Sequence, residues 1–98
     1  SGPKDINRIA LVSSHEKANF TEMKTILDSF ISLLGLKYEI QETTHNSFIE
    51  GRVGRILSGN KKIGYIGEIN PIILKNFGLE MPVSAMEINL DELFDILR

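Results

Sequence analysis

Four basic side chains lie close together in the sequence and are the residues best suited to binding chemistry. They fall between residues 51 and 67, a stretch without any acidic residue: Arg52, Arg55, Lys61 and Lys62. If this stretch folds as a β-hairpin, the lysines project at its tip and could contact phosphates with a modest, salt-sensitive affinity. Lysines at such a tip also keep an exposed edge soluble, so a binding role and a plain surface role both stay open.

Arg52 differs from the other three cations because it stands beside glycine at the mouth of a predicted strand. It follows Gly51, and the expected hairpin register places it opposite Gly67. A guanidinium in this position can lie close to the backbone and pair bidentately with Glu50 or Glu68. We therefore expect Arg52 to be partly buried and to serve the fold.

The other residue types that carry chemistry form no recognisable site. Cysteine is absent, which excludes thiol nucleophiles, disulfides and cysteine-based zinc sites. His15 and His45 lack a metal-ligand spacing, and Ser13-Ser14 lacks the context of an activated serine. The glycines of residues 51–67 lie within a predicted hairpin, whereas a phosphate loop joins a strand to a helix N-terminus. The sequence predicts no catalytic, cofactor-binding or metal-binding residue.

Composition indicates one ordinary globular domain. The chain has 98 residues, 42% of them hydrophobic, which is enough for a single core. A formal charge of -2 provides no overall field for a polyanion. The apolar runs are shorter than the ~20 residues of a membrane span, and no signal peptide is visible. We expect a cytoplasmic protein without membrane contact, with residues 1–6 a disordered segment or an expression remnant and residues 7–98 one domain.

Hydrophobic periodicity predicts the elements that position the cations. Residues 8–13 form a short predicted strand, and its continuous apolar run from Ile9 to Val12 is typical of a strand covered on both faces. Apolar side chains then recur at helical spacing from residue 23 to 34. Asn19 is a favourable N-cap, Glu22 is placed to complete a capping box, and Gly35 ends the helix.

The second half of the chain alternates strands with short helices. Residues 36–41 alternate as a half-buried strand, and residues 53–57 and 62–69 form the arms of a hairpin. Its tip, Gly59-Asn60, suits a type II′ turn, which places Ile56 opposite Ile63.

A short helix capped by Asn70 follows, with Leu74 and Phe77 expected to face inward. A strand at residues 83–90 and a last helix complete the order β-α-β-β-β-α-β-α. This order predicts an α+β fold, a largely antiparallel sheet flanked by helices.

Six ordered stretches carry a more specific signal than any single motif. They are residues 8–10, 18–24, 47–53, 63–71, 77–79 and 83–90. Together, over about residues 7 to 94, they resemble the β subunit of phenylalanyl-tRNA synthetase (phenylalanine–tRNA ligase). The segments NFTE and FIEGR resemble its archaeal and eukaryotic type. Asn70 stands where the family often has His, and both residues can cap a helix.

The resemblance implies a role in protein biosynthesis within a heterotetrameric ligase of two α and two β subunits. That holoenzyme attaches phenylalanine to its tRNA with ATP and Mg2+, and its active site lies in the α subunit. The chain would be the C-terminal part of a degenerate, class II synthetase-like core. The implied partners are the catalytic α subunit and tRNA, with the four hairpin cations as candidate contacts and no cofactor held by this fragment.

The resemblance also implies that this core has lost its chemistry. A working class II site needs one arginine on an upstream hairpin and another on the final strand–helix unit to hold ATP. The final unit here has no arginine before Arg98 and carries carboxylates instead: Glu87, Asp91, Glu92 and Asp95. We expect the chain alone to be non-catalytic.

Two other functions compete with the structural module. A small nucleic-acid-binding domain would use the basic hairpin from Arg52 to Lys62, but the negative charge and the lack of stacking motifs disfavour it. A freestanding enzyme is disfavoured by the missing nucleophile, metal cluster and phosphate loop.

Overall fold

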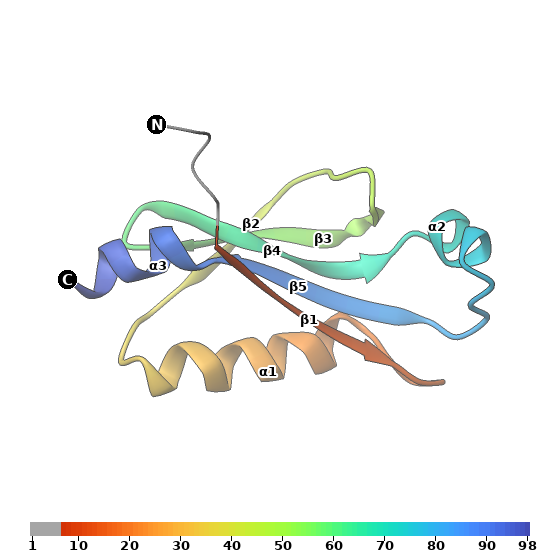
Figure 1. Ribbon diagram of the computed structural model, residues 1–98, viewed down its shortest axis with the longest axis horizontal. Helices are drawn as coiled ribbons and strands as arrows, with labels where there is room; N and C mark the ends of the chain where they lie inside the picture. Colours follow the sequence, from red (N-terminus) through yellow and green to blue (C-terminus); the bar gives the residue numbers. More distant parts are fainter. Residues whose placement is uncertain (1–6) are drawn as a thin grey trace.

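The computed structural model describes residues 7–98, which form a five-stranded antiparallel sheet and three helices (Figure 1). The strands are β1 (Arg8–Ser14), β2 (Glu39–Glu42), β3 (Phe48–Ser58), β4 (Lys61–Ile69) and β5 (Val83–Asn89), and the helices are α1 (Phe20–Leu33), α2 (Pro71–Asn76) and α3 (Leu90–Leu97). Across the sheet the strand order is β1-β5-β4-β3-β2. The predicted α+β class and element order are confirmed. The expectation for residues 1–6 lies outside the described residues.

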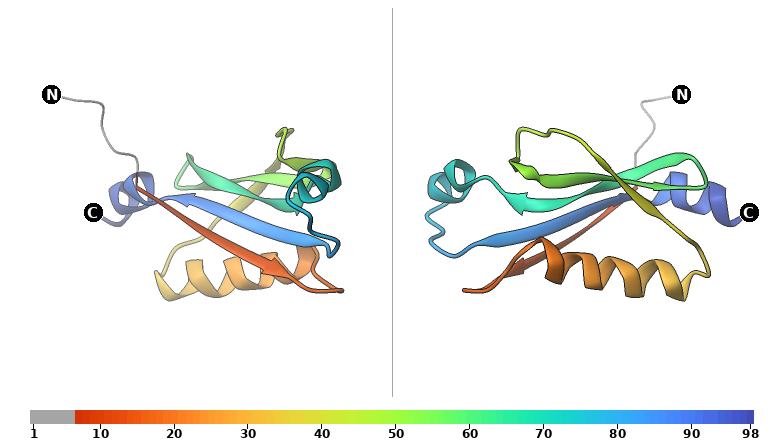
Figure 2. Two further views of the ribbon diagram at one scale, coloured as in Figure 1. Left: turned by 45° about the vertical axis from the view of Figure 1, so that its right-hand side comes forward. Right: turned by 180° about the vertical axis from the view of Figure 1, so that it is seen from behind.

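Helix α1 covers one face of the sheet, and no helix of residues 7–98 covers the opposite face. Figures 1 and 2 show α1 running along the sheet, with α2 and α3 at its two ends. Met23, Leu27 and Ile31 on α1 are at most 1% exposed. They form one cluster with buried residues of the sheet and of α3: Ile56, Ile63, Ile66, Met86, Ile88 and Leu93. The core therefore lies between α1 and one side of the sheet.

Local signals determine both ends of α1. Asn19 is the N-cap, and its Oδ1 accepts the N–H of Glu22 at 2.8 Å. The predicted capping box is wrong, because the Glu22 carboxylate accepts from Ser13 and lies 2.6 Å from His15 Nε2. Gly35 ends the helix as predicted, with a φ of 69° that closes a Schellman motif.

Two apolar segments expected in the core lie at the surface. The strand predicted to be covered on both faces, β1, is an edge strand that pairs only with β5. Its Ile9, Leu11 and Val12 are therefore 36%, 37% and 65% exposed. Phe77 is 77% exposed because it is the C-cap of a six-residue helix at the end of the sheet.

The predicted hairpin register is wrong by one residue beyond the tip. Gly59 and Asn60 both have positive φ, 56° and 65°, which makes the turn type I′ rather than II′. A register shift follows between Ile56 and Leu57, so Ile56 pairs with Gly64 instead of Ile63. This bulge cannot be read from apolar alternation, since both registers keep isoleucines on the buried side.

The α1–sheet interface predicts a strong contrast between two leucines of one helix. Leu27 is 0% exposed and Leu33 is 86% exposed. We expect Leu27→Ala to lower the free energy of unfolding by about 3–5 kcal/mol, because it leaves a cavity in the core. The same truncation at Leu33 should change it by less than about 0.5 kcal/mol. Urea denaturation of the two variants checks this, and equal losses would contradict the packing described.

Tyr38, just before β2, makes stability depend on alkaline pH. Burial, together with the Asp28 carboxylate that accepts its hydroxyl, raises the pKa of Tyr38 from 10.0 to about 12. Because the folded-state pKa is the higher one, this stabilisation is complete below about pH 10 and is lost as the pH rises through about 12.

We therefore expect the free energy of unfolding to fall across that window and Tyr38→Phe to remove part of the fall. Denaturation at a series of alkaline pH values measures both profiles. The comparison with the variant is needed because lysines titrate in the same range. Parallel profiles for the two proteins would contradict the prediction.

Candidate functional site

The four hairpin cations do not form one contact surface. Arg52 and Arg55 are three positions apart on β3, so strand alternation places them on opposite faces of the sheet. Arg52 lies on the face covered by α1. Arg55 and Lys62 line the opposite face, which no helix of residues 7–98 covers and which we call the open face. Lys61 turns toward α3 instead. The four cations of the predicted hairpin are thus divided among three separate parts of the surface.

Arg52 belongs to a bridge between the hairpin and α1. Its guanidinium lies 3.0 Å from Glu68 Oε1, and Glu68 Oε2 accepts the backbone N–H of Phe20 at 2.9 Å. Phe20 is the first residue of α1, where a carboxylate interacts favourably with the helix dipole. The Glu68 side chain is only 15% exposed, but that of Arg52 is 60% exposed. The expected position of Arg52 opposite Gly67 is wrong, because Val53 lies there. Of the two candidate partners, Glu68 pairs with Arg52, and Glu50 joins no ion pair within residues 7–98.

Lys61 fastens the hairpin tip to the last helix. Its Nζ lies 3.2 Å from Asp95 and 3.5 Å from Glu92. The hydrogen bond that Lys61 donates to Asp95, followed by the negative charge of Asp95, raises the pKa of Lys61. The hairpin tip thereby engages two acidic side chains of α3, Glu92 and Asp95.

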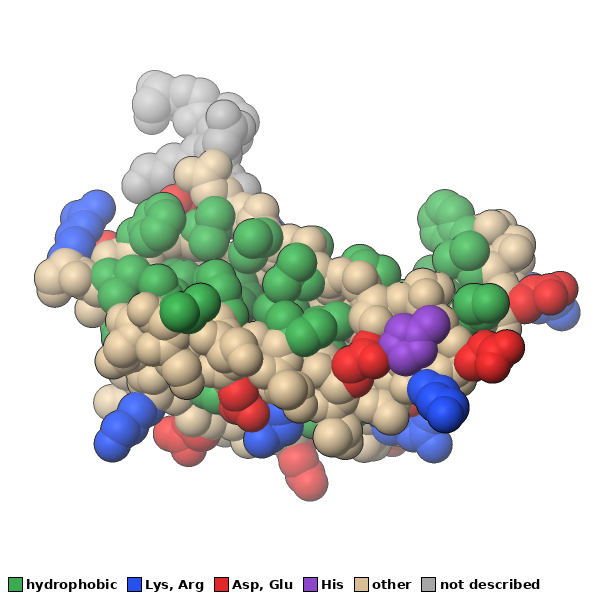
Figure 3. Space-filling view, turned by 90° about the horizontal axis from the view of Figure 1, so that it is seen from below, with side chains coloured by type: hydrophobic (Ala, Val, Ile, Leu, Met, Phe, Trp, Pro, Cys, Tyr) green, Lys and Arg blue, Asp and Glu red, His purple; other side chains and the backbone are tan. Residues whose placement is uncertain are grey.

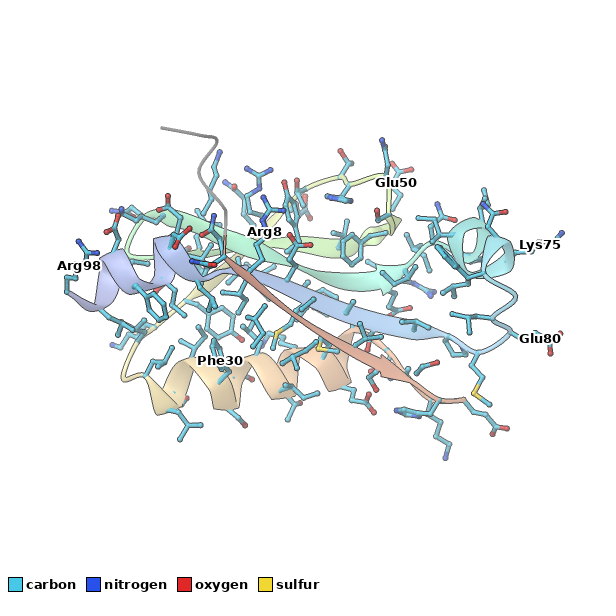
Figure 4. All side chains as sticks on the ribbon, in the orientation of Figure 1. Arg8, Phe30, Glu50, Lys75, Glu80 and Arg98 are labelled. Carbon is cyan, nitrogen blue, oxygen red and sulfur yellow. The ribbon has the colours of Figure 1, made fainter. Side chains whose placement is uncertain are left out.

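A row of polar side chains crosses the open face. Strand pairing places Glu87, Tyr65, Arg55 and Gln41 side by side on β5, β4, β3 and β2. The guanidinium of Arg55 lies 5.0 Å from the Tyr65 ring centre and donates to the Tyr65 hydroxyl. Arg8 of β1 pairs with Glu87 at 2.6 Å. In Figure 4, Arg8 and Phe30 lie on opposite sides of the sheet.

The two histidines have packing and pairing roles. His45 packs edge-on against Tyr65 and Phe48, with ring centres 4.8 Å and 5.2 Å away. His15 is paired with Glu22. Within residues 7–98 no group of three or more potential ligand side chains could hold a metal ion.

Comparison with known proteins agrees with the sequence resemblance. The profile of a family described as "Phenylalanyl tRNA synthetase beta chain CLM domain" matches residues 1–90. The chain belongs to this phenylalanyl-tRNA synthetase β-chain family. Three relatives are each described as a phenylalanine–tRNA ligase β subunit.

The relative from Thermococcus onnurineus is 49% identical over 90% of this chain and 15% of its own length. That from Pyrococcus abyssi is 47% identical over 89% of the chain and 16% of its length. That from Aeropyrum pernix is 38% identical over 93% of the chain and 17% of its length. The chain thus spans about 15% of the length of the first relatives and corresponds to a fragment of a β subunit.

Arg8 is the site residue that sequence reasoning missed. It lies far along the chain from Arg55 and Lys62, and only the order β1-β5-β4-β3 brings it to the same face. The available signal was an arginine at the start of a predicted strand, which becomes informative only once the neighbouring strands are known.

The bridge at Glu68 predicts unequal effects for its two partners. Glu68→Ala should lower the free energy of unfolding by about 1.5–3 kcal/mol, because it leaves Arg52 and the Phe20 N–H without their acceptor. Arg52→Ala should lower it by less than about 1 kcal/mol, since that side chain is mostly exposed. Glu50→Ala is the control and should be neutral. Chemical denaturation measures all three, and a larger loss for Arg52→Ala than for Glu68→Ala would contradict this account.

Proposed function

We propose that the chain is a non-catalytic structural module of a phenylalanine–tRNA ligase and helps to hold the catalytic α subunit. The family match supports the parent enzyme, and the ATP, Mg2+ and tRNA of that reaction belong to the whole assembly in this proposal. We further propose that residues 7–98 are one degenerate class II synthetase-like core domain of the archaeal and eukaryotic type. Its proposed location is the cytoplasm. No helix within residues 7–98 is long and apolar enough to cross a bilayer.

One observation carries the proposed contact with the α subunit: a broad apolar surface over α1, α3 and the edge of β1 (Figure 3). Its large side chains are each at least 36% exposed: Ile9, Leu11, Ile26, Leu33, Phe94 and Leu97. The outer edge of β1 also leaves backbone groups unpaired within residues 7–98. Contiguous apolar surface beside a free strand edge is typical of a protein interface.

The final strand–helix unit supports the non-catalytic part of the proposal. Glu87 is paired with Arg8, and Glu92 and Asp95 with Lys61. Arg98, the arginine of this unit, lies 82% exposed beyond the end of α3. Residues 83–97 thus contain no arginine, whereas a working class II site would need one in this unit to hold ATP.

The docking surface can be tested with matched exposed phenylalanines. Phe94 lies on the proposed surface and is 52% exposed, whereas Phe77 lies at the other end of the sheet and is 77% exposed. Each is replaced by Glu in the β subunit of a reconstituted ligase, and α-subunit affinity is measured by sedimentation. We expect Phe94→Glu to weaken assembly at least about tenfold, because a charge is desolvated in the interface. Phe77→Glu should leave it unchanged, and the reverse pattern would contradict the proposal.

The isolated chain should have no aminoacylation chemistry. We expect phenylalanine-dependent exchange of pyrophosphate into ATP to stay at background for the 98-residue chain. The reconstituted holoenzyme serves as the positive control. Exchange above background that persists after removal of traces of α subunit would overturn the non-catalytic assignment.

A further inference from the structure

The open face of the sheet contains a shallow hollow whose chemistry the structural role does not use. It measures about 200 Å³, and its lining includes the following side chains: Arg8, Arg55, Lys62, Tyr65, Glu87 and Asn89. These residues come from β1, β3, β4 and β5, so the hollow exists only in the assembled sheet. It lies on the side of the sheet away from α1, and its function is independent of the proposed role of the chain.

Charge distinguishes this hollow from the rest of a net negative molecule. Its lining has three cations and one carboxylate, a local charge of +2, whereas the whole chain carries -2. Glu87 engages Arg8 at 2.6 Å. Arg55 and Lys62 form no ion pair with a carboxylate within residues 7–98. Two positive groups therefore remain available to a negatively charged ligand.

Arg55 is held in place before any ligand arrives. Its guanidinium lies over the Tyr65 ring and donates to the Tyr65 hydroxyl, and the His45 ring packs edge-on against the Tyr65 ring. A guanidinium fixed by stacking and one hydrogen bond loses little entropy on binding, and its remaining N–H groups stay free to donate. Tyr65 is thus a positioning residue for Arg55.

We propose that this hollow binds a phosphate group, with Arg55 and Lys62 as its main ligands. The planar guanidinium fork matches two phosphate oxygens, and Lys62 supplies a second, mobile charge at the rim. A dianionic phosphate balances the local charge, which a single carboxylate would not. The hollow is smaller than the ~300–1,000 Å³ of pockets that enclose drug-sized ligands, so it accepts the phosphate group rather than a whole cofactor.

Replacement of Glu87 should raise the affinity of the hollow for phosphate rather than lower it. Its carboxylate repels an anion and also occupies Arg8, so removing its charge should both lower the repulsion and release a third cation. Glu87→Gln should therefore tighten phosphate binding several-fold. A residue that merely supported the local structure would weaken binding when replaced.

The experiment is a titration of the 15N-labelled chain with inorganic phosphate in phosphate-free buffer, followed by amide chemical shifts. We expect saturable shifts at Lys62, Gly64 and Tyr65 with a dissociation constant on the order of 1 mM. Lys62→Gln should weaken binding about tenfold, because it removes one charged donor. Lys75→Gln, an equal charge change on α2, should have no effect.

Further arms identify the ligand that carries the phosphate. The titration is repeated with a 5′-mononucleotide, which carries a phosphate monoester, and with a short single-stranded RNA that has only backbone phosphates. Tighter binding of either ligand than of inorganic phosphate supports the site. Acetate at the same ionic strength tests for a general anion site. The proposal would be overturned if acetate bound as tightly as phosphate or if no saturable shift appeared. It would also be overturned if Lys62→Gln and Lys75→Gln had equal effects, or if Glu87→Gln weakened binding.

Discussion

The burial of α1 against one side of the sheet is the interaction on which the rest of the molecule depends. The helix side chains buried in this interface are Met23, Leu27 and Ile31. Each fully buried aliphatic side chain contributes roughly 1.5–3 kcal/mol, so a few of them decide whether so small a domain folds. Because one helix covers one face, each central strand must alternate between core residues and residues that meet solvent. The polar open face is a direct result of this one-sided cover.

Two features set the geometry of the sheet. Glu68 joins the first residue of α1 to Arg52, so the hairpin and the helix are held in one orientation. Gly64 allows β4 and β5 to approach closely, because a Cβ there would lie 1.9 Å from the carbonyl oxygen of Glu87. That approach places Tyr65 beside Glu87, so the row of polar side chains depends on a residue that has no side chain.

The features that were predictable from the sequence are those set by neighbouring residues. Asn19 and Gly35 define the ends of α1 because capping involves only a few consecutive residues. The periods of 3.6 and 2 likewise identified α1 and β2, and an apolar run, turn residues and caps identified the other elements in order. Features that depend on distant segments were not predictable in this way: the bulge that shifts Ile56 to Gly64, the edge position of β1, and the recruitment of Glu22 by Ser13 and His15. Each of these needs a partner that no local pattern specifies.

The same distinction explains why the hairpin cations were a partial guide to the site. Proximity in sequence suggested that the four cations share one surface. Alternation along β3 separates Arg52 from Arg55, and Lys61 pairs with Asp95 of α3. Arg55 and Lys62 meet Arg8 only because the edge strand β1 pairs with β5. An apolar surface on the α1 side and a cationic hollow on the open side are then separated by the thickness of the sheet. A substitution on one side, such as Phe94→Glu, can therefore change protein contact without altering the charges that face a ligand on the other.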